Sequence, residues 1–463
     1  MEERALGLGM ALAGVRNRGL TMSLITPVKV EKLQKALHVK AKEEAGFRFY
    51  QLYDKVYRAD VLAYAYRLCR ANGGAAGVDG ETFESIESAR VEVWLGELAE
   101  TLRKKTYRAD PVRRVWIPKA KGKRRPLGIP TIRDRVVQTA VVLVLEPIFE
   151  SDLEPEQYAF RPKRSALDAV KQVHGLLRRG YDEVVDADLS GYFDSIPHAE
   201  LMRSVARRVC DRHLLALIKQ WLVVPVEEDD GRGGRRRTTR SKDEKRGVPQ
   251  GAPISPLLSN LYMRRFVLAW KTLGHERRLR AYIVNYADDF VICCRGTAAE
   301  AMEAMREIMK RLKLTVNEEK TSCRRISAAE SVDFLGYTIG RCYSTKTGRA
   351  YVGTWPSKQS IRKVTAKISD LTARRMTLLE ADLLVGRLNR LLVGWGNYFC
   401  LGPVSKAYRA VDAHTRKRLR WWLCNKHKRK GKGTKRYPDE YLYEQLGLVR
   451  LPMRTHNLPW AKA

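Results

Sequence analysis

The sequence lacks the cysteine spacings that mark zinc sites and disulfide frameworks. Its 8 cysteines stand at positions 69, 210, 293, 294, 323, 342, 400 and 424, with no Cys-x-x-Cys pair and no Cys/His ligand spacing. We therefore expect reduced thiols, mostly buried as small apolar side chains, in a cytosolic protein. A zinc site is not expected.

Long apolar runs and acidic residues are also scarce. No stretch approaches the roughly 18 apolar residues that a bilayer-spanning helix needs. Asp and Glu number 52 against 87 Lys and Arg, a formal net charge of +35. Such an excess repels itself unless a polyanion is the working partner, and phosphate backbones are the commonest polyanion. An anionic membrane is the competing partner, but no long basic helix with an apolar face stands out, so nucleic acid is favoured.

Against this basic background, an acidic pair interrupts an apolar segment. Residues 283–294 read Ile-Val-Asn-Tyr-Ala-Asp-Asp-Phe-Val-Ile-Cys-Cys, which predicts two short strands joined by a tight turn, with Asp288 and Asp289 at its tip. Adjacent carboxylates repel each other, and Mg²⁺ is a common cation for such a pair. A solvated hairpin turn is the alternative reading, and it stays open on the dipeptide alone.

A second acidic cluster precedes this pair in the sequence. Residues 184–196 begin as an apolar strand and then carry Asp186, Asp188 and Asp194 before a helical pattern. Two-metal nucleotidyl transfer needs carboxylates from different chain segments that converge on the attacking and leaving oxygens. Asp188 with Asp288 and Asp289 would supply that set, and Asp186 and Asp194 compete with Asp188 for its role.

Three motifs occur in a defined order along the centre of the chain. They are the spacing from Asp188 to Phe193, Pro-Gln-Gly-Ala-Pro-Ile-Ser-Pro at 249–256, and Tyr-Ala-Asp-Asp at 286–289. Together they resemble the palm motifs of reverse transcriptases, specifically the bacterial group II intron-encoded reverse transcriptase/maturase family. The resemblance favours Asp188 as the metal carboxylate, because the family places an aromatic residue five positions after it.

The resemblance implies an α+β fold. It predicts a right-hand polymerase, with fingers and a palm built on an antiparallel sheet, followed by an all-α thumb/maturase domain. We expect a disordered leader at 1–27, an N-terminal extension and the start of the fingers at 28–110, fingers and palm at 111–345, the helical thumb/maturase domain at 346–436, and a short tail at 437–463 without an endonuclease domain.

Local patterns predict several elements within this frame. Residues 112–129 predict a basic hairpin, and residues 133–149 predict a helix that is apolar on nearly all its faces. Ser165 is expected to cap the next helix. The charged residues 227–246 are too polar to bury much surface and predict a mobile hairpin tip or loop.

The resemblance also assigns roles to active-site residues. The carboxylates of Asp188, Asp288 and Asp289 would be catalytic and, with Leu189, would hold two Mg²⁺ ions, for which Mn²⁺ could substitute. Phe193 would lie under the sugar and exclude a ribose 2′-OH; a packed core phenylalanine is the alternative. Lys320 would be a general acid toward pyrophosphate, with a surface ion pair as the alternative. The expected nucleotide-binding residues are Lys119, Arg125, Phe193, Gln250 and Lys320.

The C-terminal part carries the strongest basic bias. Residues 405–436 contain 13 Lys and Arg against the single acid Asp412, with Tyr408, Trp421 and Trp422 among them. Cations for phosphates and aromatic rings for bases indicate an RNA surface, although most of these rings are expected to pack the helices. The expected template or RNA contacts are Arg161, Arg164, Lys406, Arg409, Arg416, Lys417 and Arg420.

These observations predict an RNA-directed DNA polymerase encoded by a group II intron, located in the bacterial cytosol or nucleoid. Its partners would be intron RNA, an RNA template, a DNA primer or target and deoxynucleoside triphosphates, and it would assist splicing and retrohoming. Two alternatives remain at this stage: a domesticated reverse transcriptase in defence or repair, and a splicing cofactor whose polymerase site is idle.

Overall fold

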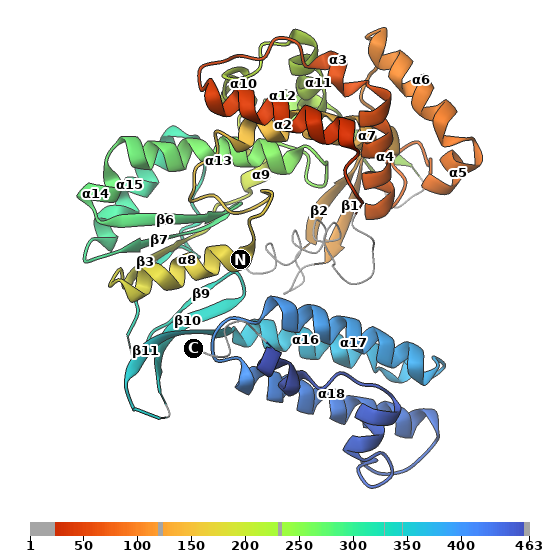
Figure 1. Cartoon of the computed structure of the whole chain (residues 1–463), viewed down its shortest axis with the longest axis vertical. Helices are drawn as coiled ribbons and strands as arrows, with labels where there is room; N and C mark the ends of the chain where they lie inside the picture. The colour runs from red at the N-terminus through yellow and green to blue at the C-terminus, as the bar shows by residue number, and fades with distance from the viewer. Residues whose placement is uncertain (1–23, 119–123, 230–233, 328, 345, 458–463) are drawn as a thin grey trace.

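The computed structural model describes residues 24–118, 124–229, 234–327, 329–344 and 346–457. Helices and small sheets are combined in it, which is the α+β class predicted from the sequence (Figure 1). Most of the expected leader lies outside the described residues. No helix within the described ranges is long and apolar enough to cross a bilayer.

A helical layer forms the upper part of the molecule in Figure 1 around one central helix. α7 (Ile132–Glu150) is buried along most of its length, as its apolar residues predicted. α2 (Val28–Glu43) and α4 (Ala59–Asn72) pack against it. The same region contains α3 (Tyr53–Val56), α5 (Phe83–Ser88) and α6 (Val91–Arg103).

The predicted basic hairpin is present as β1 (Val112–Pro118) and β2 (Arg124–Ile129), and it belongs to a sheet of order β2-β1-β4-β5. β4 (Val226–Asp229) runs parallel to β1, and β5 (Arg235–Thr238) pairs antiparallel with β4. Residues 227–246, which were expected to form a mobile hairpin tip or loop, are thus paired into this sheet on both sides of the tip. The acidic strand β4 lies beside the arginine-rich strand β5, so opposite charges face each other. α11 (Arg212–Val223) and α12 (Arg240–Asp243) flank it in sequence.

The central sheet has the order β6-β7-β3-β8, and all its pairings are antiparallel. Its strands are β6 (Ala281–Tyr286), β7 (Asp289–Cys294), β3 (Glu183–Ala187) and β8 (Ser322–Arg325). Figure 1 shows α8 on one side of this sheet and α13 and α15 on the other. The helices around it are α8 (Ala166–Arg178), α9 (Tyr192–Ser195), α10 (His198–Ala206), α13 (Ser255–Thr272), α14 (His275–Arg278) and α15 (Ala298–Arg311).

Helices cover both faces of the central sheet, which explains why consecutive residues of β7 are apolar, with no alternation between apolar and polar side chains. Val291 and Cys293 pack in one apolar cluster with α8, whereas Phe290 and Ile292 pack in another with α13 and α15. Ser165 caps α8 as predicted, since its side chain accepts a hydrogen bond from the backbone N–H of Asp168 and the Asp168 carboxylate reciprocates.

A third sheet, of order β11-β10-β9, leads into the C-terminal helices. It consists of β9 (Val332–Phe334), β10 (Tyr337–Tyr343) and β11 (Ala350–Pro356). The boundary expected between residues 345 and 346 falls inside the β10–β11 hairpin, whose antiparallel ladder joins both sides of it. The helical domain therefore begins with α16 (Lys358–Leu371).

α16 packs with α17 (Ala381–Tyr398) and α18 (Ser405–Lys426) in the lower part of Figure 1. A 3₁₀ turn at Arg374–Met376, a π-helical turn at Tyr441–Gln445 and a 3₁₀ segment at Leu451–Asn457 complete this region. Leu442, Leu448 and Leu451 lie in the same apolar core as α16–α18. The expected C-terminal tail is thus part of the helical domain over the residues described.

Candidate active site

The acidic pair lies at a two-residue turn between β6 and β7. Tyr286 pairs with Asp289, so Ala287 and Asp288 form the turn. Ala287 has a φ of 58°, a left-handed conformation that residues other than glycine seldom adopt. Asn285 Nδ2 donates to the carbonyl oxygen of Ala287 at 2.8 Å and supports this turn. The predicted hairpin is confirmed, with Asp289 as the first residue of β7.

Asn285 also joins the hairpin to the loop that follows α7. The backbone N–H of Asn285 donates to the carbonyl oxygen of Glu156 at 2.9 Å, and the N–H of Tyr158 donates to the carbonyl oxygen of Asn285 at 2.9 Å. Asn285 is fully buried. The position of the turn therefore depends on the 151–165 loop.

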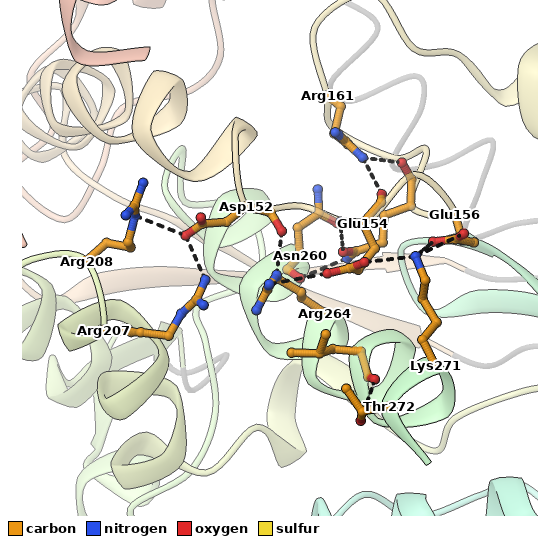
Figure 2. Close-up of polar contacts among 12 residues, drawn as sticks. Asp152, Glu154, Glu156, Arg161, Arg207, Arg208, Asn260, Arg264, Lys271 and Thr272 are labelled. Atoms are coloured by element: carbon orange, nitrogen blue, oxygen red, sulfur yellow. Dashed lines mark hydrogen bonds and ion pairs between the residues drawn. The ribbon is translucent and has the colours of Figure 1, made fainter. Parts of the chain in front are cut away.

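Ion pairs hold this loop against its neighbours (Figure 2). Arg207 and Arg208, which follow α10, approach the Asp152 carboxylate at 2.7 and 3.3 Å. From α13, Arg264 and Lys271 approach Glu154 at 3.2 and 3.1 Å, and Lys271 also approaches Glu156 at 3.2 Å. The loop network, defined as these ion pairs together with Arg161 and Glu150, matches each of its carboxylates with a cation.

Strand register brings the third carboxylate beside the hairpin. Asp186 pairs with Val291 and Ala187 with Phe290, so the next step of the same register sets Asp188 opposite Asp289. Asp188, Asp288 and Asp289 are only 1, 3 and 6% exposed. A solvated hairpin turn is therefore wrong, and the three predicted carboxylates form one buried site, which we call the carboxylate site.

The carboxylate site has an excess of negative charge. Burial raises the pKa of Asp289 well above its ordinary value, and the neighbouring charges of Asp288, Asp188 and Asp186 raise it further. Burial also raises the pKa of Asp186 to about 7, with Arg324 acting in the opposite direction and Asp188 in the same one. The Oδ1 atom of Asp289 is buried without a hydrogen-bond partner among the described residues. A bound cation would relieve both conditions.

One cation reaches the site from the loop before β8. Lys320 Nζ lies 2.9 Å from Asp188 Oδ2, and Asn317 Nδ2 donates to the same oxygen at 3.0 Å. The backbone N–H of Asn317 donates to the carbonyl oxygen of Asp188 at 2.8 Å. Lys320 thus pairs with a candidate catalytic carboxylate. Sequence reasoning missed Asn317, and its only signal was its place beside Lys320 in Val316-Asn-Glu-Glu-Lys.

The donor chemistry fits magnesium, although the ligands are not gathered in this conformation. Carboxylate oxygens are the donors that Mg²⁺ prefers, and Leu189, whose side chain is aliphatic and buried, offers only its main-chain carbonyl. Among the described residues, no group of three or more His, Cys, Asp and Glu side chains stands ready as a ligand set. The Asp188 carboxylate is instead directed at Lys320 and Asn317.

Phe193 lies just beyond the carboxylate site. Gly191, with φ of 56°, turns the chain from β3 into α9, which carries Phe193. The ring is 5% exposed and meets Tyr192 edge-on, with ring centroids 5.6 Å apart. Phe193 is thus mostly packed, as the alternative reading expected, and its sugar-sensing role remains a prediction.

The Pro-Gln-Gly loop joins α9 to the β1–β2 sheet. Gln250 Nε2 donates to Asp194 Oδ2 at 3.1 Å, and its carbonyl oxygen accepts from the N–H of Gly128 in β2 at 2.7 Å. Gly251 has a φ of +108°, and a Cβ there would lie 2.4 Å from the carbonyl oxygen of Gly128. Two segments predicted to contact the nucleotide therefore meet where only glycine fits.

The two predicted triphosphate ligands belong to the β1–β2 hairpin. Lys119 lies outside the described residues. The backbone of Arg125 is in β2, opposite Ile117. Both assignments remain predictions.

Arg161, a predicted template contact, lies inside the protein in this structure. This residue is 8% exposed, and its guanidinium pairs with Glu150 at 2.8 Å and donates to the carbonyl oxygens of Glu154 and Gln157. The donors of Arg161 serve the 151–165 loop, and its template contact stays a prediction. Arg164 is half-buried and donates to the carbonyl oxygen of Pro155 at 2.6 Å, so it too braces this loop.

The predicted RNA contacts of α18 divide into two groups. Lys406, Arg409 and Lys417 are exposed. Arg416 and Arg420 instead pair with Asp439, and Arg416 also approaches Asp412 at 3.2 Å. Only the first group is available to a large anion without breaking ion pairs within the protein.

The central part of the chain is of the reverse transcriptase class. Residues 117–339 match the family described as "Reverse transcriptase (RNA-dependent DNA polymerase)", and residues 361–439 match "Group II intron, maturase-specific domain". Protein YkfC of Escherichia coli K12 is 33% identical over 397 residues, which cover 77% of this chain and 100% of YkfC. Group II intron-encoded protein LtrA of Lactococcus lactis is 28% identical over 359 residues, which cover 63% of this chain and 57% of LtrA.

The chain belongs to the group II intron-encoded reverse transcriptase/maturase family. It spans little more than half the length of LtrA, although it covers the whole of YkfC. A shorter similarity, 32% identity over 126 residues, links 26% of this chain to 17% of nuclear intron maturase 2, mitochondrial, of Arabidopsis thaliana.

Proposed function

We propose that the chain is an RNA-directed DNA polymerase encoded by a group II intron, which copies RNA into DNA in the bacterial cytosol and binds its intron RNA to assist splicing and retrohoming. The observation that supports this most strongly is the carboxylate site, where Asp188, Asp288 and Asp289 are buried together at a strand end and a hairpin turn. A buried carboxyl such as Asp289, whose pKa is raised by burial and by neighbouring acids, marks a site of chemistry more often than a scaffold.

The arrangement of the sheets supports a right-hand polymerase. In this proposal, the β2-β1-β4-β5 sheet with the upper helices is the fingers, the β6-β7-β3-β8 sheet is the palm, and α16–α18 are the thumb and maturase region (Figure 1). The Pro-Gln-Gly loop then lies where the fingers meet the palm, as its hydrogen bond to Gly128 requires.

Asp188, Asp288 and Asp289, with the main-chain carbonyl of Leu189, would hold two Mg²⁺ ions. Bound magnesium supplies positive charge for the attacking and leaving oxygens of an in-line displacement. The same charge would keep Asp289 ionised despite its burial, because it offsets the repulsion from Asp288 and Asp188.

Other side chains would bind and orient the nucleotide. Lys119 and Arg125 would bind the triphosphate, and Phe193 and Gln250 would border the deoxyribose. Lys320 would leave Asp188 on nucleotide binding and donate a proton to the departing pyrophosphate, a motion that its 45% exposed side chain permits.

The test is extension of a DNA primer on an RNA template with Mg²⁺ and deoxynucleoside triphosphates. We expect extension by the wild type. Asp288→Ala should lose at least about 100-fold in extension, because the variant lacks a carboxylate that would hold magnesium at the reacting phosphate. RNA binding by Asp288→Ala should be unchanged. No extension by the wild type, with RNA binding retained, would favour a splicing cofactor whose polymerase site is idle.

A further inference from the structure

One exposed strip runs along α18, on the side away from its core. It comprises Lys406, Arg409, Ala410, Ala413, Lys417 and Trp421, which recur every three or four residues and are all exposed. Between Lys406 and Trp421 the helix rises by about 22 Å. The opposite face carries Tyr408, Val411, Leu419 and Trp422, which are all fully buried. The α18 strip is therefore a single outward face with cations along it and an indole at its end.

Adjacent tryptophans in α18 have opposite environments. Trp422 is 0% exposed and belongs to the apolar core, whereas Trp421 is 45% exposed. A large exposed indole gains nothing for folding by facing water. Sequence alone did not separate the two residues, and their helical phase does.

The indole of Trp421 is held in place by a fixed cation. The guanidinium carbon of Arg418 lies 4.5 Å from the ring centroid of Trp421. Arg418 is itself anchored to α16 and its C-terminal end, since it donates to Thr372 Oγ1 at 3.0 Å and to the carbonyl oxygen of Ser369 at 2.9 Å. An aromatic ring positioned before binding loses little entropy when a flat partner stacks on it.

The charges of the strip suit a phosphate chain. Within the described ranges, no carboxylate forms an ion pair with Lys406, Arg409 or Lys417, unlike Arg416 and Arg420 on the adjoining side of the helix. Asp370 of α16 acts on Arg418, which adjoins the strip. The small side chains of Ala410 and Ala413 between the cations leave room for a backbone to approach the helix.

We propose that the α18 strip binds an unpaired segment of RNA, with a base stacked on Trp421 and phosphates on Lys406, Arg409 and Lys417. This deepens the maturase function proposed above and rests on it. The partner is single-stranded because duplex bases stack on one another and do not present a face to an indole. In Figure 1, α16 and α17 lie between α18 and the central sheet that carries the carboxylate site.

The test measures binding of the full chain to a fluorescein-labelled oligouridylate of about 12 nucleotides and to an RNA duplex of the same length. We expect Trp421→Ala to weaken binding of the single strand about tenfold and binding of the duplex less than about twofold. Trp421→Phe should restore most of the loss, since a ring is kept. Lys417→Gln should lower the slope of log affinity against log salt by about 0.7.

The matched control is Tyr343→Ala, which removes an aromatic ring that is 56% exposed and lies beside Arg341, 5.9 Å from its centroid. It should bind both RNAs like the wild type. Unchanged single-strand binding by Trp421→Ala, or equal losses for single strand and duplex, would overturn the stacking role.

Primer extension by the wild type separates this inference from the proposed function. If the wild type extends primers but single-strand binding does not depend on Trp421, only the proposed role of the α18 strip is refuted. If single-strand binding depends on Trp421 but the wild type does not extend primers, only the proposed polymerase activity is refuted.

Discussion

The loop network and the carboxylate site are neighbours whose acids have opposite surroundings. The hairpin that carries Asp288 and Asp289 is joined to the 151–165 loop by the hydrogen bonds from Asn285 to Glu156 and from Tyr158 to Asn285. In the loop network, Asp152 faces Arg207 and Arg208, and Glu154 faces Arg264 and Lys271 (Figure 2). In the carboxylate site, three acids meet one lysine within the described contacts. The difference teaches that acids paired one by one with cations fix the position of a loop, whereas three acids gathered at one place are an arrangement that we expect to need a bound cation.

We expect the largest difference between the two regions when one carboxylate in each is replaced by an amide of the same shape. Asp289→Asn should reduce primer extension by about 100-fold or more while leaving the free energy of unfolding unchanged or higher, because repulsion from Asp288 is removed. Asp152→Asn should instead lower that free energy by about 2–4 kcal/mol, since Arg208 is 1% exposed and loses its carboxylate partner while keeping only hydrogen bonds to backbone carbonyl oxygens such as those of Glu44 and Phe47. Urea titrations of both variants test this, and equal destabilisation by Asp289→Asn would make the hairpin acids structural.

Arg161 tests the network from the cationic side. Arg161→Met should lower the free energy of unfolding by about 3–5 kcal/mol, because Glu150 and two carbonyl oxygens lose their donors inside the protein. Arg306→Met is the control, since Arg306 pairs with Glu318 at 2.7 Å on the surface and should change stability by less than about 1 kcal/mol. If the two variants lose similar amounts in chemical denaturation, Arg161 is not part of a buried network.

The smallest expected effect concerns pH. The pKa of Asp186 is about 7 in the folded chain, above the ordinary value near 3.9, so the folded state retains a proton that the unfolded state releases. Its contribution to stability is complete below about pH 4 and is lost as the pH rises to about 7. In magnesium-free buffer, Asp186→Asn should reduce this decline by on the order of 2 kcal/mol. Parallel pH profiles for wild type and variant would show that Asp186 is ionised when folded.

Local sequence patterns were sufficient for the elements of the site. The apolar runs around Ala287 and Asp288 predicted the hairpin, the apolar faces of residues 133–149 predicted α7, and Ser165 was correctly placed as a cap. Each of these depends on neighbours within a few residues. The motif resemblance added which acid of residues 184–196 would join the hairpin, and the register of β3 with β7 agrees with Asp188.

Pairings between distant side chains could not be predicted in the same way. Arg161 and Arg164 looked alike as basic residues of one motif, but both brace the 151–165 loop. Asn317 carried no distinctive signal until its contact with Asp188 was seen. The helical phase that exposes Trp421 and buries Trp422 depends on which face of α18 meets α16.

The contacts of Asp188 have a consequence for the timing of folding. Its described partners Asn317, Lys320 and Thr321 follow it by 129, 132 and 133 residues. Closing so large a loop delays native pairing, and a ribosome adding about 5–20 residues per second would need roughly ten seconds to deliver the partners. A growing chain would thus have synthesised the carboxylate site and its partners before α18 (Ser405–Lys426), whose exposed cations we propose bind RNA, leaves the ribosome.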